Sequence, residues 1–161
     1  MSVGQRITLP DFPVEGGCTC GALRYRLSGR PLYVIACHCR ACQRLGGSDY
    51  TLSMFVLRRD FTAYSGIPAR SERTAESGRR LPGLFCSDCG TRVWHEPVHS
   101  PHTINIRAGT LDDPSWAQPI GHIWIECKKA HVTLPPDAIR IEGQPTDRQP
   151  FLDAWAAATG G

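Results

Sequence analysis

The fold of this chain is decided by Gly17-Cys18-Thr19-Cys20-Gly21, in which two thiols lie two residues apart between glycines. A second pair with a following glycine lies far along the chain, in Cys86-Ser87-Asp88-Cys89-Gly90. Thiolates this close together can converge on one ion at about 2.3 Å, as tetrahedral zinc requires, and the glycines let backbone N–H groups turn toward the sulfur atoms. We therefore predict a closed structural zinc site with four ligands: Cys18, Cys20, Cys86 and Cys89.

A third cluster lies between these two pairs, in Cys37-His38-Cys39-Arg40-Ala41-Cys42. Three ligands fill three corners of a tetrahedron and leave the fourth open to water or substrate, which is the arrangement of catalytic zinc. We predict a second zinc on Cys37, Cys39 and Cys42 and take these three as the catalytic candidates. Two zinc ions per chain follow, and folding is expected to depend on the closed site because that site joins distant segments.

The composition is that of a small globular protein, since 161 residues fit one domain and 41% of them are hydrophobic. No apolar run follows Met1 and none approaches the roughly 20 residues that span a bilayer, so we expect neither secretion nor membrane insertion. Unpaired cysteines at metal-binding spacing favour the cytoplasm, with disulfides as the less favoured alternative. The formal charge of +3 is too small to indicate nucleic-acid binding, and the arginines between residues 70 and 80 read as a solvated loop.

Thirteen prolines and sixteen glycines divide the chain into short apolar segments. This pattern predicts an all-β fold of short, mainly antiparallel strands. The expected strands cover residues 23–27, 33–36, 50–57, 61–64, 84–85, 92–95, 103–107 and 122–125. The segment 65–83, rich in Gly, Arg and Ser, is expected to form a hairpin with an irregular loop that covers the second zinc.

A short C-terminal helix is predicted over about 147–159, where apolar residues recur at helical spacing: Phe151, Leu152, Trp155 and Ala158. Thr146-Asp147 precedes them and offers an N-cap. The helix is expected to cover the core rather than to bind a cofactor. We therefore predict a single domain over residues 1–161, with its core at about 14–142.

Three stretches follow one known pattern: Gly17–Gly21 with Arg24-Tyr25 after it, Cys37–Arg44, and Phe85–Thr91. Together they resemble the glutathione-dependent formaldehyde-activating enzyme family, which includes centromere-protein-V-like proteins. The resemblance extends from about residue 16 to 128, because a later family element also appears here as His122-Ile123-Trp124. It implies an Mss4-like fold of small packed sheets, with a structural zinc on the four-cysteine set and a second zinc on the Cys-x-Cys-x-x-Cys set.

The resemblance implies an enzyme that adds glutathione to formaldehyde to give S-hydroxymethylglutathione, a reaction classed with the carbon–sulfur lyases. The partners are then a small-molecule thiol and an aldehyde, with glutathione as the expected substrate. An open zinc suits this chemistry in two ways, because it can deprotonate a bound thiol or polarise the carbonyl oxygen as a Lewis acid. Residues 128–131 read Lys-Lys-Ala-His where family members often carry a tryptophan, which leaves the natural substrate open.

Five further side chains are candidates for the site or its surroundings. Arg44 could hold a substrate carboxylate, and reads equally well as a solvated arginine at a helix end. His122 is a pocket candidate from the resemblance, and we group it with Arg44 as residues expected to bind glutathione. His95 reads as a packed histidine rather than a catalyst. His38 is expected to turn away from the metal because side chains alternate along an extended chain. Cys127 is interpreted as a buried thiol, with a metal or redox role as the alternative.

Two other classes of function stay open on the sequence alone. In a zinc-stabilised binding module, both sites are structural and a protein group such as His38 or Cys127 fills the fourth position of the second site. In a thiol redox sensor, oxidation of the Cys-x-Cys-x-x-Cys cluster releases its zinc. The sequence does not fix the oligomeric state, and a homo-oligomer is compatible with it.

Overall fold

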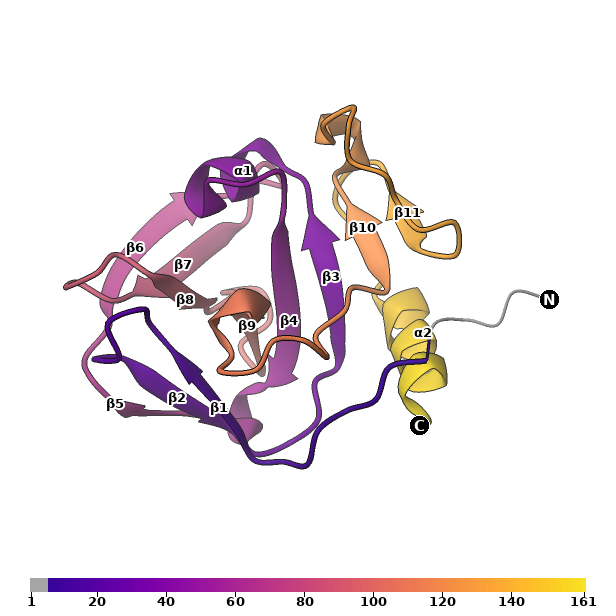
Figure 1. Ribbon diagram of the computed structural model, residues 1–161. Helices are drawn as coiled ribbons and strands as arrows, with labels where there is room; N and C mark the ends of the chain where they lie inside the picture. The colour runs from indigo at the N-terminus through magenta and orange to yellow at the C-terminus, as the bar shows by residue number, and fades with distance from the viewer. Residues whose placement is uncertain (1–5) are drawn as a thin grey trace.

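The computed structural model describes residues 6–161 and consists mainly of strands (Figure 1). Within these residues, eight strands form one sheet in the order β11-β10-β3-β4-β9-β8-β7-β6, and three form a second in the order β1-β2-β5. The predicted all-β class with a C-terminal helix is confirmed. The strands are β1 (Val14–Gly17), β2 (Arg24–Leu27), β3 (Tyr33–Cys37), β4 (Thr51–Leu57), β5 (Phe61–Ser65), β6 (Ala69–Thr74), β7 (Arg80–Phe85), β8 (Arg92–His95), β9 (Thr103–Arg107), β10 (Gly121–Ile123) and β11 (Ile139–Ile141).

Helices and short turns connect these strands. The helices are α1 (Arg40–Gly46) and α2 (Gln149–Thr159), and the 3₁₀ turns are η1 (Arg58–Asp60), η2 (Ala108–Thr110) and η3 (Ile125–Cys127). The chain enters α1 through Cys39, whose Sγ accepts a hydrogen bond from the Cys42 amide at 3.3 Å. α1 ends at Gly47, whose φ of +57° lies in the left-handed region that favours glycine. From residue 6 onward, no helix is long and apolar enough to cross a membrane.

The segment 65–83 differs in part from the prediction. A hairpin is present, but β6 and β7 pair regularly, from Ala69 opposite Phe85 to Thr74 opposite Arg80, and only residues 75–79 form the turn. β6 lies at the edge of the large sheet, and its residues alternate between half-buried and exposed. Its charged and hydroxyl side chains are therefore those of a solvated edge strand, and the irregular loop that we expected from them is wrong.

The predicted strand 122–125 is shorter in the structure, where β10 ends at Ile123. Trp124 has a φ of +58°, which lies in the left-handed region and breaks the extended conformation. The turn η3 follows immediately. The chain thus leaves the sheet two residues earlier than the apolar run in the sequence indicates.

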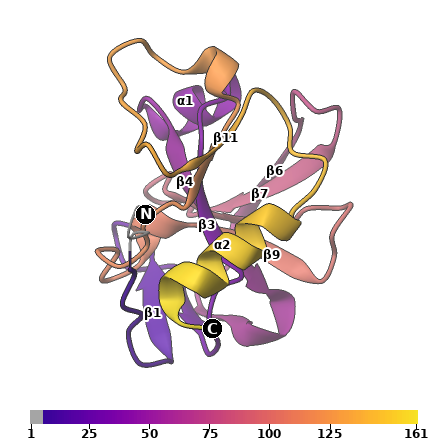
Figure 2. The same ribbon diagram turned by 90° about the vertical axis from the view of Figure 1, so that its right-hand side faces the viewer.

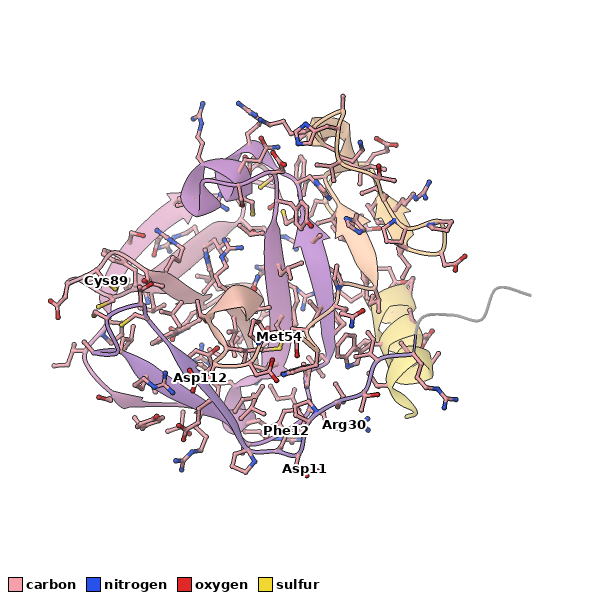
Figure 3. The ribbon with its side chains drawn as sticks, in the orientation of Figure 1. Asp11, Phe12, Arg30, Met54, Cys89 and Asp112 are labelled. Carbon is pink, nitrogen blue, oxygen red and sulfur yellow. The ribbon has the colours of Figure 1, made fainter. Side chains whose placement is uncertain are left out.

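One face of the large sheet packs against the small sheet and forms the apolar core (Figure 1). Trp94 of β8 contacts Phe61 of β5 at a ring distance of 5.0 Å. Ile106 of β9 lies between Trp94 and Met54 in the strand register, so the three side chains share this face. All three are buried, and Met54 is labelled near the middle of the molecule in Figure 3. Asn105 and Arg107 alternate with the isoleucines of β9 and therefore point to the other face.

The C-terminal helix α2 packs against β3 on one side of the large sheet (Figure 2). It begins two residues later than predicted, and the Asp147 side chain accepts a hydrogen bond from the Gln149 amide at 2.9 Å. Phe151 and Trp155 are buried, and the Phe151 ring stacks on Tyr33 of β3 at 5.6 Å. The expectation that this helix covers the core is confirmed.

Close packing of β1 against β2 and η2 makes Gly16 sensitive to substitution. A Cβ atom there would overlap the Tyr25 hydroxyl and lie 2.5 Å from the carbonyl oxygen of Thr110. Because backbone cannot move aside cheaply, we expect Gly16→Ala to lower the free energy of unfolding by about 1–3 kcal/mol. Gly109→Ala is the matched control, since a Cβ there meets no atom within 4 Å. Urea unfolding of both variants tests this, and equal stability would contradict the packing described.

Candidate metal centres and their cavity

Four cysteines from two distant turns converge between the two sheets. Their Sγ atoms all lie within 4.8 Å of one another, and the group comprises Cys18, Cys20, Cys86 and Cys89. The first two lie in the turn between β1 and β2 and the last two in the turn between β7 and β8, where Figure 3 labels Cys89. A hydrogen bond from the Thr19 amide to the Thr91 hydroxyl, at 3.2 Å, joins the two turns directly. The group therefore links the small sheet to the large one.

Thiols in this group change one another's pKa values, as expected for ligands that share one metal ion. Hydrogen bonding from Thr91 lowers the pKa of Cys89 to about 5. The Ala22 amide favours the Cys20 thiolate, but the neighbouring Cys18 and Cys89 thiols raise the pKa of Cys20 to about 12. Four thiolates cannot coexist at this spacing without a cation. The donor set therefore fits a divalent ion held by four sulfur atoms.

The second group contains Cys37, Cys39 and Cys42, whose Sγ atoms also lie within 4.8 Å of one another. Cys37 ends β3, Cys39 precedes α1, and Cys42 lies in the first turn of that helix, so a strand-to-helix turn brings them together. All three are buried. Hydrogen bonds from Cys37 and Cys39, with the nearby positive charge of Arg107, lower the pKa of Cys42. Cys39 and Cys42, together with burial, raise the pKa of Cys37. This group is also arranged to bind a metal ion.

A cavity of about 110 Å³ adjoins the three-cysteine group. Its floor is the polar face of the large sheet, with Ser53, His95, Asn105 and Arg107. Its mouth is lined by cationic and aromatic groups that include Arg73, Arg79, His99, Trp124 and Arg148. The turn of the β6–β7 hairpin closes one side, where Glu76 accepts a hydrogen bond from the Ala41 amide at 3.1 Å. The hairpin segment thus lies over the second cysteine group, as the sequence predicts.

Several residues singled out from the sequence lie outside this cavity. His122 is buried, and its Nδ1 lies 2.9 Å from Nε2 of His38. Within residues 6–161, the three-cysteine group contains no histidine and does not include Cys127. Cys127 is half-buried, and its carbonyl accepts from the Gln43 side chain at 3.0 Å. Arg44 is exposed in the last turn of α1. This position agrees with its interpretation as a solvated arginine at a helix end.

Arg107 and Asn105 are cavity residues that the sequence reasoning did not single out. Arg107 is only 9% exposed and donates to the hydroxyl groups of Thr51 at 2.5 Å and Ser53 at 3.4 Å. The sequence of β9 alternates polar residues with isoleucines, which is usually read as one solvated and one buried face. The feature of the sequence that could have indicated a buried polar face is Arg107, because a buried guanidinium needs an anionic or hydroxyl partner nearby.

A family model described as glutathione-dependent formaldehyde-activating enzyme matches residues 13–127. The chain belongs to this family. A curated protein of Halomonas elongata, provisionally named a glutathione-dependent formaldehyde-activating enzyme, is 30% identical over 141 residues, which cover 84% of this chain and 85% of that protein. A Rhodobacter sphaeroides protein of known crystal structure is 20% identical, with a TM-score of 0.48, and the match covers 61% of this chain and 87% of that protein. The family resemblance in the cysteine clusters is thereby confirmed.

Removing one thiol from each group separates their roles. We expect Cys89→Ser to lose one metal ion per chain and to lower the free energy of unfolding by about 3 kcal/mol or more, because the four-thiol group joins the two sheets. Cys39→Ser should lose one ion with little change in stability, since its group lies within one strand-to-helix turn. Cys127→Ser is the control and should change neither quantity. Elemental analysis and urea unfolding measure both, and a fully stable Cys89→Ser protein would contradict the assignment.

The pair of His38 and His122 predicts a pH dependence of stability. Burial and the charge of His38 lower the pKa of His122 to about 4, from 6.5 in the unfolded chain. Between these pH values the unfolded chain binds a proton that the folded chain does not, so stability falls as the pH falls. His122→Asn keeps an acceptor for His38 but cannot be protonated. We expect this variant to lose less stability than wild type between pH 8 and pH 5 in urea unfolding; equal losses would show that His122 is not responsible.

Proposed function

We propose that this chain is a zinc-dependent carbon–sulfur lyase that adds glutathione, or a related thiol, to formaldehyde or another small aldehyde. The observation that carries the proposal is the cavity whose wall contains three converging thiols, Cys37, Cys39 and Cys42. Family membership supports the same reaction. A wholly structural second site has no need of an adjoining cavity, which is why an enzyme is favoured over a binding module.

Both cysteine groups fit zinc, because sulfur donors at this spacing suit a tetrahedral divalent ion. We assign the four-cysteine group to a structural zinc and the three-cysteine group to a catalytic one. Bound there, zinc supplies a Lewis acid that stabilises a substrate thiolate or polarises a carbonyl oxygen. The buried charge of Arg107 beside Cys42 offsets part of the negative charge of the thiolates.

The size of the cavity decides how much of the substrate it can hold. A single water needs about 10–15 Å³, so a cavity of about 110 Å³ accepts roughly ten non-hydrogen atoms, fewer than a tripeptide contains. The thiol group of glutathione and the aldehyde would therefore enter the cavity. The remainder of the peptide would lie across the mouth.

The mouth has the charge that a carboxylate-bearing thiol requires. Arg79 and Arg148 both direct a guanidinium nitrogen at Nε2 of His99, at 3.2 and 3.1 Å. Burial and the two arginines lower the pKa of His99, so the ring is neutral and accepts from them. Each guanidinium has further donors that can pair with a carboxylate. These two arginines line the cavity, whereas Arg44, the carboxylate anchor considered from the sequence, does not.

The reaction is tested by exchange spectroscopy, because thiols add to formaldehyde without a catalyst. Two-dimensional NMR exchange between free glutathione and its hydroxymethyl adduct measures the rate at equilibrium. We expect wild type with two zinc ions to raise the exchange rate above the uncatalysed rate and Cys39→Ser to return it to that rate. If the two proteins exchange equally, the proposed reaction is wrong.

Arg148→Gln tests the cationic mouth. We expect KM for glutathione to rise about 3- to 10-fold, since one charge-assisted contact is lost, while KM for 2-mercaptoethanol, which has no carboxylate, stays the same. Arg59→Gln is the control, because Arg59 is 81% exposed at its side chain and is not among the residues that line the cavity. An equal rise for both thiols in Arg148→Gln would indicate a structural role.

A further inference from the structure

The floor of the cavity contains a buried polar group that the fold itself does not use. His95 is fully buried, and neither of its ring nitrogens has a hydrogen-bond partner within residues 6–161. The Oδ1 atom of Asn105, directly opposite His95 in the β8–β9 register, also has none in that range. Buried polar groups in folded proteins are almost always paired, so an unpaired imidazole that lines a cavity calls for a ligand. The sequence reading of His95 as a packed histidine explains its burial but not its free nitrogens.

The neighbours of His95 leave its ring open toward the cavity. Gly83 lies opposite His95 on the other side, and a Cβ there would be 3.5 Å from the ring carbon Cε1. Phe55 lies opposite Asn105 and supplies an apolar wall. Polar atoms are therefore concentrated at one place on the floor, with Arg107 two residues beyond Asn105 on the same face of β9.

The electrostatics of the floor keep the ring uncharged. Burial, reinforced by the positive charges of Arg107 and Arg92, holds the pKa of His95 well below its usual range. A neutral imidazole has one N–H donor and one acceptor nitrogen. His95 and Cys42 line the same cavity. The cavity thus has sulfur ligands on one wall and a neutral donor–acceptor pair on its floor.

We propose that His95 is a catalytic residue that binds the aldehyde oxygen, and then the hydroxyl of the product, through a ring N–H group, with Asn105 beside it. This inference rests on the proposed function. As the C–S bond forms, the π pair of the carbonyl moves to oxygen, and that oxygen takes the ring proton. The other ring nitrogen takes the proton released by the thiol, so the imidazole ends neutral as its other tautomer. The reaction needs no further reactant, since thiol and aldehyde supply every atom of the adduct.

The kinetic test compares His95→Leu, His95→Gln and the control His102→Leu, whose exposed imidazole is not among the residues that line the cavity. We expect His95→Leu to lower kcat/KM for formaldehyde about 100-fold, the usual loss on removing a donor to a developing oxyanion. Its Kd for glutathione should match that of wild type, because the proposed hydrogen bond is made to the aldehyde oxygen and not to the thiol. His95→Gln keeps a donor and should recover part of the rate, and His102→Leu should match wild type. A His95→Leu rate equal to wild type, or an equal loss of glutathione affinity, overturns the proposal.

Stability separates this role from a structural one. A histidine that held the fold together would destabilise it when removed. Here the leucine replaces an unpaired buried imidazole, so we expect the Tm of His95→Leu to equal or exceed that of wild type. A large fall in Tm in both His95 variants would assign the residue to packing instead.

A binding test works whether or not the protein is an enzyme. Calorimetry on the zinc-loaded protein compares 2-mercaptoethanol with 1-propanethiol, which differ only by a hydroxyl in place of a methyl group. We expect the ratio of their affinities to favour the hydroxyl thiol about 3- to 10-fold more in wild type than in His95→Leu. If this shift appears without any catalysed exchange, the oxygen site stands and the reaction is wrong. If exchange is catalysed and neither test responds to His95, the reaction stands and the oxygen site is wrong; if there is neither exchange nor a shift, both are wrong.

Discussion

The convergence of four thiols is the constraint on which the rest of the structure depends. Two come from the turn between β1 and β2 and two from the turn between β7 and β8, so the group fastens the small sheet to the large one. Ionised sulfur atoms at this spacing repel one another. The neighbouring thiols raise the pKa of Cys20, whereas hydrogen bonding from Thr91 lowers that of Cys89. A divalent ion bound by the four sulfur atoms would remove this repulsion and cross-link the two sheets.

The turn that holds Cys86 and Cys89 also leads into a strand that lines the cavity. β8 begins soon after Cys89 and carries Trp94 into the core and His95 to the cavity, on opposite faces of the same strand. β3 likewise packs Val34 into the interior and ends in Cys37, the first of the three cysteines. The strands that build the core therefore also fix the floor and wall of the cavity. Groups held on regular strands keep their relative positions better than groups held on loops, which suits a site that must align two small reactants.

Sequence reasoning succeeded where spacing along the chain determines the structure. The two cysteine groups and the strands around them are predictable because each depends on a few adjacent residues. The polar floor is different, because the alternation in Thr103–Arg107 predicts a strand but not whether its polar face meets water or an enclosed cavity. That depends on the β6–β7 hairpin and on α2, which come from distant segments. The shape of the hairpin was itself mispredicted, since charged residues on an edge strand resemble a loop in sequence. His95 shows the same limit, because its burial follows from the sequence whereas the lack of partners for its nitrogens does not.

The position of α2 has a consequence for how the family can diversify. The match to the family model ends at residue 127, yet Arg148 and Phe151, which come later in the chain, line the cavity with the cysteines. Part of the entrance to the thiol cluster is thus contributed by a stretch of chain that follows the family match. Exchange of the C-terminal stretch alone would alter which molecules reach the thiols and leave the thiols themselves in place, so that one reactive centre could serve relatives with different substrates.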